Sequence, residues 1–205
     1  MSNMISLRRS LLALALSTCA TLASAATTLH IELNTVSFGT SGWIDLQFNP
    51  APLAPAAATA DLRNFVGFGN SATAMWQEAS GSLASGVHMS TANGPSSLFH
   101  EVTFSGGKVG FDVTIDSVAG NGGTAFSLAL LDSQGNALGV GQNGYSLLTM
   151  NWTPAATAGA SGTLAADNYN ANLVKVTPVP EPSSWLMLGA GVALLGLVRR
   201  RKLAA

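Results

Sequence analysis

Short runs that alternate hydrophobic and polar residues dominate the middle of this chain. The runs LHIELN (29–34) and WIDLQF (43–48) place apolar side chains at every second position. The runs KVGFDVTID (108–116) and TAFSLALLD (124–132) follow the same rule. A period of two is typical of a β-strand with one buried and one solvated face. The pattern therefore predicts a core made of Leu29, Ile31, Leu33, Ile44, Leu46, Phe48, Val109, Phe111, Val113, Ile115, Phe126, Leu128 and Leu130.

Turn-forming residues separate the strand-like runs. Asn121-Gly122-Gly123 lies between two of them, and glycine accepts the positive φ of tight hairpin turns. The segment 132–136 (DSQGN) closes the next run in the same way. The sequence shows no helical period over a dozen residues in this region.

Two further segments are predicted to be loops that lead into strands. The proline-rich segment 49–58 is excluded from a central strand because proline lacks a ladder donor, and it leads to a strand expected near 60–68. The Gly, Ser and Ala residues of 155–162 predict a loop before a last strand near 173–177. The fold class expected for residues 26–177 is all-β: one antiparallel β-sandwich, jelly-roll-like, with two sheets packed through their apolar faces.

The first 25 residues have the organisation of a secretory signal peptide. Arg8 and Arg9 precede the apolar segment 11–22, and Ala23-Ser24-Ala25 forms an A-x-A cleavage site. Cleavage is expected after Ala25, and the Sec translocon is the expected export partner.

A lipoprotein signal ending at Cys19 is the competing interpretation of the same segment. Thr18 is a poor residue before a lipidated cysteine, and the A-x-A site downstream favours ordinary cleavage. Because Cys19 is the chain's single cysteine, the mature body would contain no thiol, disulfide or Cys-ligated metal.

The net charge of −1 hides a segregation of charged residues. Between residues 26 and 177 there are nine acidic side chains and three cations, which are Arg63, Lys108 and Lys175. Nucleic-acid binding needs clustered Lys and Arg, so this acidic body argues against a nucleic-acid partner.

Residue patterns that would indicate catalysis are missing from the sequence. The three histidines show no H-x-H or H-E-x-x-H spacing, and His100 is in register with Leu98 and Val102, at the edge of the core. Asp112 and Asp116 share a strand face about 13 Å apart, farther than either carboxylate pair of glycoside hydrolysis. No G-x-S-x-G or phosphate-loop sequence occurs. We expect no enzyme, no catalytic residue, no cofactor and no metal, although a single calcium ion between loops stays open.

The aromatic residues give the one indication of a ligand. Trp43, Trp76 and Tyr145 are candidates for stacking on sugar rings, with Asp, Asn and Gln side chains to bind hydroxyls. Trp152 and Tyr169 belong to the same group. Burial in the core is the competing interpretation for each ring.

The tail combines a rigid spacer, an apolar segment and a cationic end. Prolines exclude a helix at Val179–Pro182, and residues 185–198 carry no charge. As a helix that segment is about 21 Å long, whereas a hydrocarbon core is about 30 Å thick. The basic cluster that follows would stop translocation at a membrane, and it consists of Arg199, Arg200, Arg201 and Lys202.

These tail residues resemble the PEP-CTERM sorting signal of Gram-negative bacteria. Pro180-Glu181-Pro182, the glycine-containing apolar segment and the terminal basic cluster occur in the order of that signal over residues 178–205. The resemblance implies exosortase, an integral-membrane enzyme that cleaves near the motif, as the processing partner. It also implies export, transient attachment to the inner membrane, and a place at the cell surface or in an exopolysaccharide matrix.

The leading hypothesis is a non-enzymatic surface or biofilm-matrix protein associated with exopolysaccharide. A carbohydrate-binding module with a defined aromatic glycan site, an enzyme acting on glycans, and a permanently membrane-anchored ectodomain are the alternatives.

Overall fold

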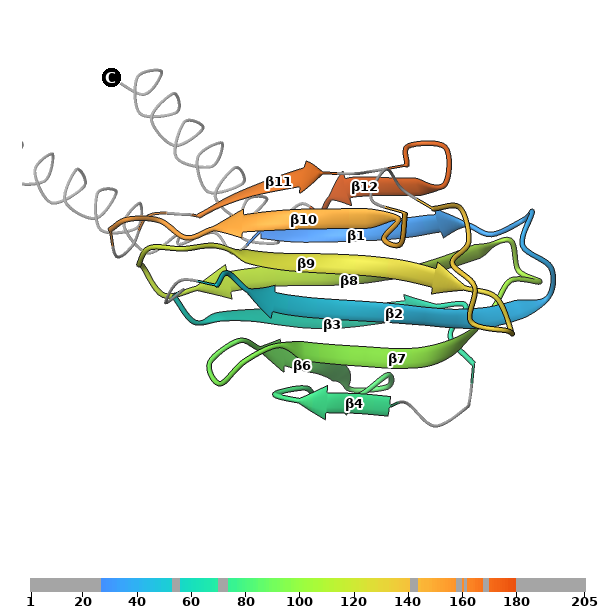
Figure 1. Ribbon diagram of the computed structural model, residues 1–205, viewed down its shortest axis with the longest axis horizontal. Helices are drawn as coiled ribbons and strands as arrows, with labels where there is room; N and C mark the ends of the chain where they lie inside the picture. The colour runs from blue at the N-terminus through green and yellow to red at the C-terminus, as the bar shows by residue number, and fades with distance from the viewer. Residues whose placement is uncertain are drawn as a thin grey trace, which may run out of the picture.

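The computed structural model describes residues 27–52, 56–69, 74–140, 144–157, 160, 162–167 and 170–179. Twelve strands in these residues form two six-stranded sheets that lie face to face (Figure 1). All strand pairs are antiparallel. The all-β architecture of two packed antiparallel sheets, predicted from the alternating pattern, is confirmed.

The two sheets are named here by their strands in spatial order. Sheet A contains β12 (Val174–Pro178), β1 (Thr27–Asn34), β8 (Lys108–Ser117), β3 (Ala58–Val66), β6 (Gly86–Ser90) and β5 (Ser80–Ser82). Sheet B contains β11 (Thr163–Asp167), β10 (Leu148–Thr153), β9 (Thr124–Leu131), β2 (Ser41–Pro50), β7 (Ser96–Thr103) and β4 (Ala74–Gln77).

Strand pairing is nested along the first eight strands. β1 pairs with β8 and β3 pairs with β6 in sheet A, while β2 pairs with β7 in sheet B. The chain alternates between the sheets from β1 to β4, and the later strands return alongside the earlier ones. Strands β9, β10 and β11 then extend sheet B beyond β2, so β2 lies in the interior of its sheet between β7 and β9.

The sequence of Asn121-Gly122-Gly123 suggested a hairpin turn, but the turn does not close a hairpin. Gly122 adopts the left-handed conformation with φ 79°, as such a turn requires. The strands on either side belong to different sheets, because β8 pairs with β1 and β3 whereas β9 pairs with β2 and β10. This turn therefore carries the chain from sheet A to sheet B.

The apolar faces of both sheets form one core. Of the thirteen residues predicted for it, Leu29 is partly buried against the core and the other twelve are buried. Phe111 of sheet A lies with its ring centroid 6.2 Å from that of Phe126 in sheet B. Full burial of one such side chain contributes about 1.5–3 kcal/mol, so this shared layer holds the two sheets together.

Two polar aromatic side chains lie in the core with hydrogen-bond partners. His100, expected at the core edge, is fully buried and places Nε2 3.0 Å from the carbonyl oxygen of Gly69, so Nε2 donates. Trp152 is 3% exposed and its Nε1 donates to Ser117 Oγ at 2.9 Å. Because Trp152 belongs to β10 and Ser117 to β8, that hydrogen bond joins the two sheets.

Strand boundaries differ modestly from the sequence prediction. β3 begins at Ala58, and the last strand continues through Pro178. The short strands β4, β5 and β6 and the later strands β10 and β11 were not predicted. No helix among the described residues is long and apolar enough to cross a membrane, and the expected tail helix lies outside them.

Candidate functional site

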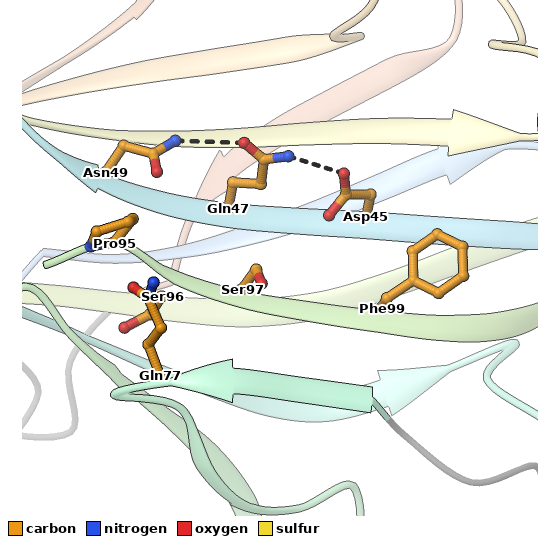
Figure 2. A pocket seen from close by; sticks show the side chains of 8 residues that line it. All are labelled: Asp45, Gln47, Asn49, Gln77, Pro95, Ser96, Ser97 and Phe99. Carbon is orange, nitrogen blue, oxygen red and sulfur yellow. Dashed lines mark hydrogen bonds between the residues drawn. The ribbon is translucent and has the colours of Figure 1, made fainter.

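A row of polar side chains runs along the outer face of β2. Asp45, Gln47 and Asn49 occupy alternate positions, opposite in direction to the buried Ile44, Leu46 and Phe48. Gln47 Nε2 donates to Asp45 Oδ2 at 2.8 Å, and Asn49 Nδ2 donates to Gln47 Oε1 at 3.4 Å (Figure 2). These three residues, called the polar row below, thus form a hydrogen-bonded line on an interior strand of sheet B.

Small side chains flank the polar row along β9 and, beside Gln47, on β7. Ser97 of β7 and Ser127 of β9 lie opposite Gln47, and alanines of β9 lie opposite the other two members of the row. Because these neighbours are short, the surface beside β2 is hollowed. A depression of about 380 Å³ lies between the polar row and β7, lined also by Pro95, Ser96, Ser97, Phe99 and, from the end of β4, Gln77 (Figure 2). We call it the β2 depression.

Aromatic rings lie at the Asp45 end of this surface. Phe99 is directly opposite Asp45 in the β2–β7 pairing and lines the depression. Trp43 stacks on Phe99 with ring centroids 5.0 Å apart and planes inclined by 10°. Both rings are partly exposed, so they give the polar row an apolar wall.

Tyr145 approaches the same carboxylate from the segment before β10. Its hydroxyl donates to Asp45 Oδ2 at 3.4 Å, and the side chain is 45% exposed. The pKa of Tyr145 is raised above 10.0, first by burial and then by the negative charge and hydrogen bond of Asp45. The phenol therefore stays protonated, and remains a donor, at neutral pH.

The predicted stacking residues have different places in the structure. Trp43 and Tyr145, far apart in sequence, both lie beside Asp45, whereas Trp152 is a core residue. The backbone of Trp76 in β4 pairs with Ser97, but its side chain lies outside the described part of the structure. Tyr169 also lies outside it.

The sequence reasoning did not single out Phe99, Gln47 or Asn49 as site residues. Gln47 and Asn49 follow Asp45 at a period of two, so alternation alone could have extended a polar row from Asp45. Phe99 lies far from this run in sequence and is brought next to it by the β2–β7 register, which the sequence does not state.

Within the described residues, the Lys and Arg side chains all belong to the other sheet. Arg63, Lys108 and Lys175 belong to β3, β8 and β12, all strands of sheet A. Acidic side chains at outward positions of sheet B, by contrast, include Asp45 on β2 and Glu101 on β7. The β2 depression consequently lies in a region of negative charge.

Sheet A carries pairs of charged and polar groups on its outer face. His30 Nδ1 lies 2.6 Å from Asp112 Oδ1, and the other Asp112 oxygen accepts a hydrogen bond from Asn64 Nδ2 at 2.6 Å. Asn64 reaches Asp112 from an irregularity in β3, where its φ is 56°. Asp112 and Asp116, expected as separate solvated carboxylates, both face outward here, and Asp112 is half of this pair.

Two more such pairs lie on that face. His88 Nδ1 lies 2.9 Å from Asp61 Oδ1, and Lys108 Nζ lies 3.0 Å from Glu32 Oε2. No group of three or more His, Cys, Asp or Glu side chains that could hold a metal ion occurs within the described residues. These contacts link neighbouring strands of sheet A.

The sandwich ends where the predicted tail begins. β12 ends at Pro178, and the Val179 N–H donates to the carbonyl oxygen of Thr28 at 3.0 Å. The predicted sorting residues (Pro180, Glu181, Pro182, Arg199, Arg200, Arg201, Lys202) and cleavage residues (Ala23, Ala25) all lie outside the described residues. The described all-β body thus ends where the predicted tail segment begins.

That segment is where the comparison with known families finds a match. A family model described as the PEP-CTERM protein-sorting motif matches residues 178–202. The chain therefore carries a PEP-CTERM sorting motif at its C-terminal end, as the resemblance of the tail predicted. The motif implies an exported protein that exosortase processes at the membrane.

The body has no counterpart in the other comparisons. Neither a search of curated proteins nor a search of solved structures gives a match.

Proposed function

We propose that this chain is an exported, non-enzymatic surface or extracellular-matrix protein whose β-sandwich associates with exopolysaccharide after exosortase processing. The PEP-CTERM match at residues 178–202 is the observation that carries the proposal. The body supports it as well, since the polar outward positions of both sheets suit a hydrated matrix. Its nested strand pairing supports a jelly-roll relationship.

The decisive experiment is the intact mass of the protein recovered separately from membranes, matrix and medium. We expect matrix or medium protein to lack residues 1–25 and the segment that follows the Pro180-Glu181-Pro182 region. A deletion of the exosortase gene should leave the tail attached and keep the protein with the membrane. Recovery of an intact C-terminus from membranes alone, in cells with active exosortase, would favour the permanently anchored alternative.

A matched pair of variants separates sorting from general export. Replacing Pro180-Glu181-Pro182 by three alanines should block tail removal, while replacing Ser183 and Ser184 by two alanines should leave processing intact. Loss of residues 1–25 in both variants would show that export itself is unaffected. Normal tail removal in the triple-alanine variant would contradict a role for this motif in sorting.

A carbohydrate-binding module is the second candidate function. The outer face of sheet B favours it, because Trp43, Phe99 and the polar row place aromatic and hydrogen-bonding groups together. The non-enzymatic part of the proposal has its own test, since incubation with the native polysaccharide should release no sugar.

A further inference from the structure

We propose that the β2 depression and its polar row bind a neutral polysaccharide chain on the outer face of sheet B. This inference rests on the proposed function, because it supposes that the exported body meets polysaccharide. It goes further by assigning the binding site, the residues that recognise the ligand and the ligand's charge class.

The hydrogen-bonding groups of the polar row suit a chain of hydroxyls. Asp45 to Asn49 span about 13 Å along β2 at about 3.3 Å per residue, the length of a short oligosaccharide. Each hydrogen bond along the row engages one N–H of a primary amide, which has two N–H donors and a carbonyl acceptor. A hydroxyl both donates and accepts, so Gln47 and Asn49 offer both halves of such contacts.

The row is already held in place before any ligand binds. Gln47 is tied to Asp45 on one side and to Asn49 on the other, and Tyr145 donates to Asp45. An ordered row loses less side-chain entropy on binding than three independent side chains would. This arrangement favours recognition of an extended polymer lying along the strand.

Aromatic side chains supply the apolar part of the site. Phe99 lines the depression at the Asp45 end, and its stacking on Trp43 fixes the orientation of both rings. Sugar rings expose C–H groups as well as hydroxyls, and these pack on aromatic surfaces with their negative π faces. The depression therefore combines apolar and polar surface as a sugar chain does.

Charge identifies the class of polysaccharide. Asp45 lies within the row and Glu101 is opposite Trp43, whereas all three cations between residues 27 and 179 belong to sheet A. An acidic polymer such as alginate would meet like charge with no Lys or Arg of sheet B to offset it. A neutral polymer incurs no such repulsion, so the site fits a neutral polysaccharide.

The test uses affinity electrophoresis of the purified full-length protein in mild detergent with EDTA. The probes are soluble neutral polysaccharides (a cellulose ether, a galactomannan and dextran), with alginate as the acidic comparison. We expect at least one neutral polymer to retard the protein and alginate to have no effect. EDTA removes calcium, which could otherwise bridge alginate to the acidic face.

Two variants remove the site in different ways. Gln47→Ala combined with Asn49→Ala deletes the amides, and Ser97→Trp fills the depression while leaving the polar row in place. Each should weaken retardation at least tenfold. The matched controls lie on the outer face of sheet A. The double variant Thr59→Ala with Thr177→Ala matches the amide deletion, and Thr59→Trp matches the filling variant. Both control proteins should bind the polysaccharide as the unaltered protein does.

Thermal unfolding of every variant checks that the fold is retained. Ser97 and Thr59 are outward, partly exposed strand positions, so their variants should fold. Three results would overturn the inference: no retardation by any neutral probe, equal weakening by the sheet A variants, or retardation by alginate alone. If binding fails while tail processing is normal, this inference is wrong and the sorting part of the proposed function stands.

Discussion

The outer faces of the two sheets share one core but differ in how they use polar side chains. On sheet A, charged and polar side chains are paired across strands, as in His30–Asp112, His88–Asp61 and Lys108–Glu32. On sheet B, the polar row is a line of amides ending at a carboxylate, bordered by aromatic rings and a depression. Several polar groups of the first face are thus paired with one another across strands, whereas the second face presents an ordered set of donors and acceptors beside a depression.

The difference follows from the neighbours that the strand register supplies. Asp112 on β8 has His30 directly opposite on β1, so a partner of complementary chemistry is within reach. Gln47 on β2 has serines opposite it on both sides, so its long side chain turns along its own strand. Similar residue types thus form cross-strand pairs on one sheet and a candidate binding surface on the other.

The largest expected loss of stability comes from a cavity in the core that both sheets share. Phe111 is fully buried and its ring lies 6.2 Å from Phe65 and 6.2 Å from Phe126. Phe111→Ala should lower the free energy of unfolding by about 3–5 kcal/mol, because it leaves a cavity between the sheets. Urea unfolding measures this, with Phe111→Leu as a control of smaller effect. A loss below about 1 kcal/mol for the alanine variant would show that the sheets do not depend on this contact.

The shared core is also what the sequence predicts best. Twelve of the thirteen positions that alternation predicted are buried, because burial depends on the direction of each side chain along its own strand. The apolar runs of β1, β2, β8 and β9 are long enough to show a period of two without any knowledge of pairing. Short strands such as β5, with three residues, contain too few positions to show that period.

The candidate site was predicted only in part, for a related reason. Trp43 and Tyr145 were identified by residue type, but their convergence on Asp45 depends on the path of the chain between β9 and β10. Phe99 joins them through the β2–β7 register. Such contacts between distant segments are set by strand pairing and by the path of the connecting segments, and local patterns encode neither. The Asn121-Gly122-Gly123 turn shows the same limit, since its residues predict a turn but not which sheet follows.

A smaller loss of stability is expected from removing the side-chain hydrogen bond between Trp152 and Ser117, which joins the two sheets. Ser117→Ala removes the acceptor of the buried Trp152 N–H, and an unsatisfied buried donor costs about 1–3 kcal/mol. Trp152→Phe removes the donor as well. In a double-mutant cycle, the two changes should be less destabilising together than the sum of each alone. Strict additivity would mean that this hydrogen bond does not couple the sheets.

Ion pairing should distinguish the two faces by its response to salt. Glu32→Gln breaks a pair whose side chains are 63% and 33% exposed, so the loss should stay below about 1 kcal/mol and shrink at high salt. Asp45→Asn alters a carboxylate of sheet B, a sheet whose strands carry no Lys or Arg, so its effect should not shrink in the same way. Urea unfolding at low and high salt makes the comparison. If salt changed the stability effect of both variants equally, the proposed difference in charge pairing between the two faces would be contradicted.

The smallest expected effect concerns the protonation of Tyr145 beside the polar row. Asp45 is a cause of its raised pKa, secondary to burial, so Asp45→Asn should lower that pKa toward 10.0 without reaching it. Absorbance of the phenolate at alkaline pH measures the titration, in a Tyr169→Phe background because the chain has two tyrosines. Since the folded state favours the neutral phenol, this group's contribution to stability is complete below pH 10 and is lost as pH rises through the folded pKa. Glu32→Gln on sheet A is the control and should leave the titration unchanged. An unaltered Tyr145 pKa in the Asp45 variant would separate the phenol from the polar row and weaken the case that the aromatic and amide groups form one site.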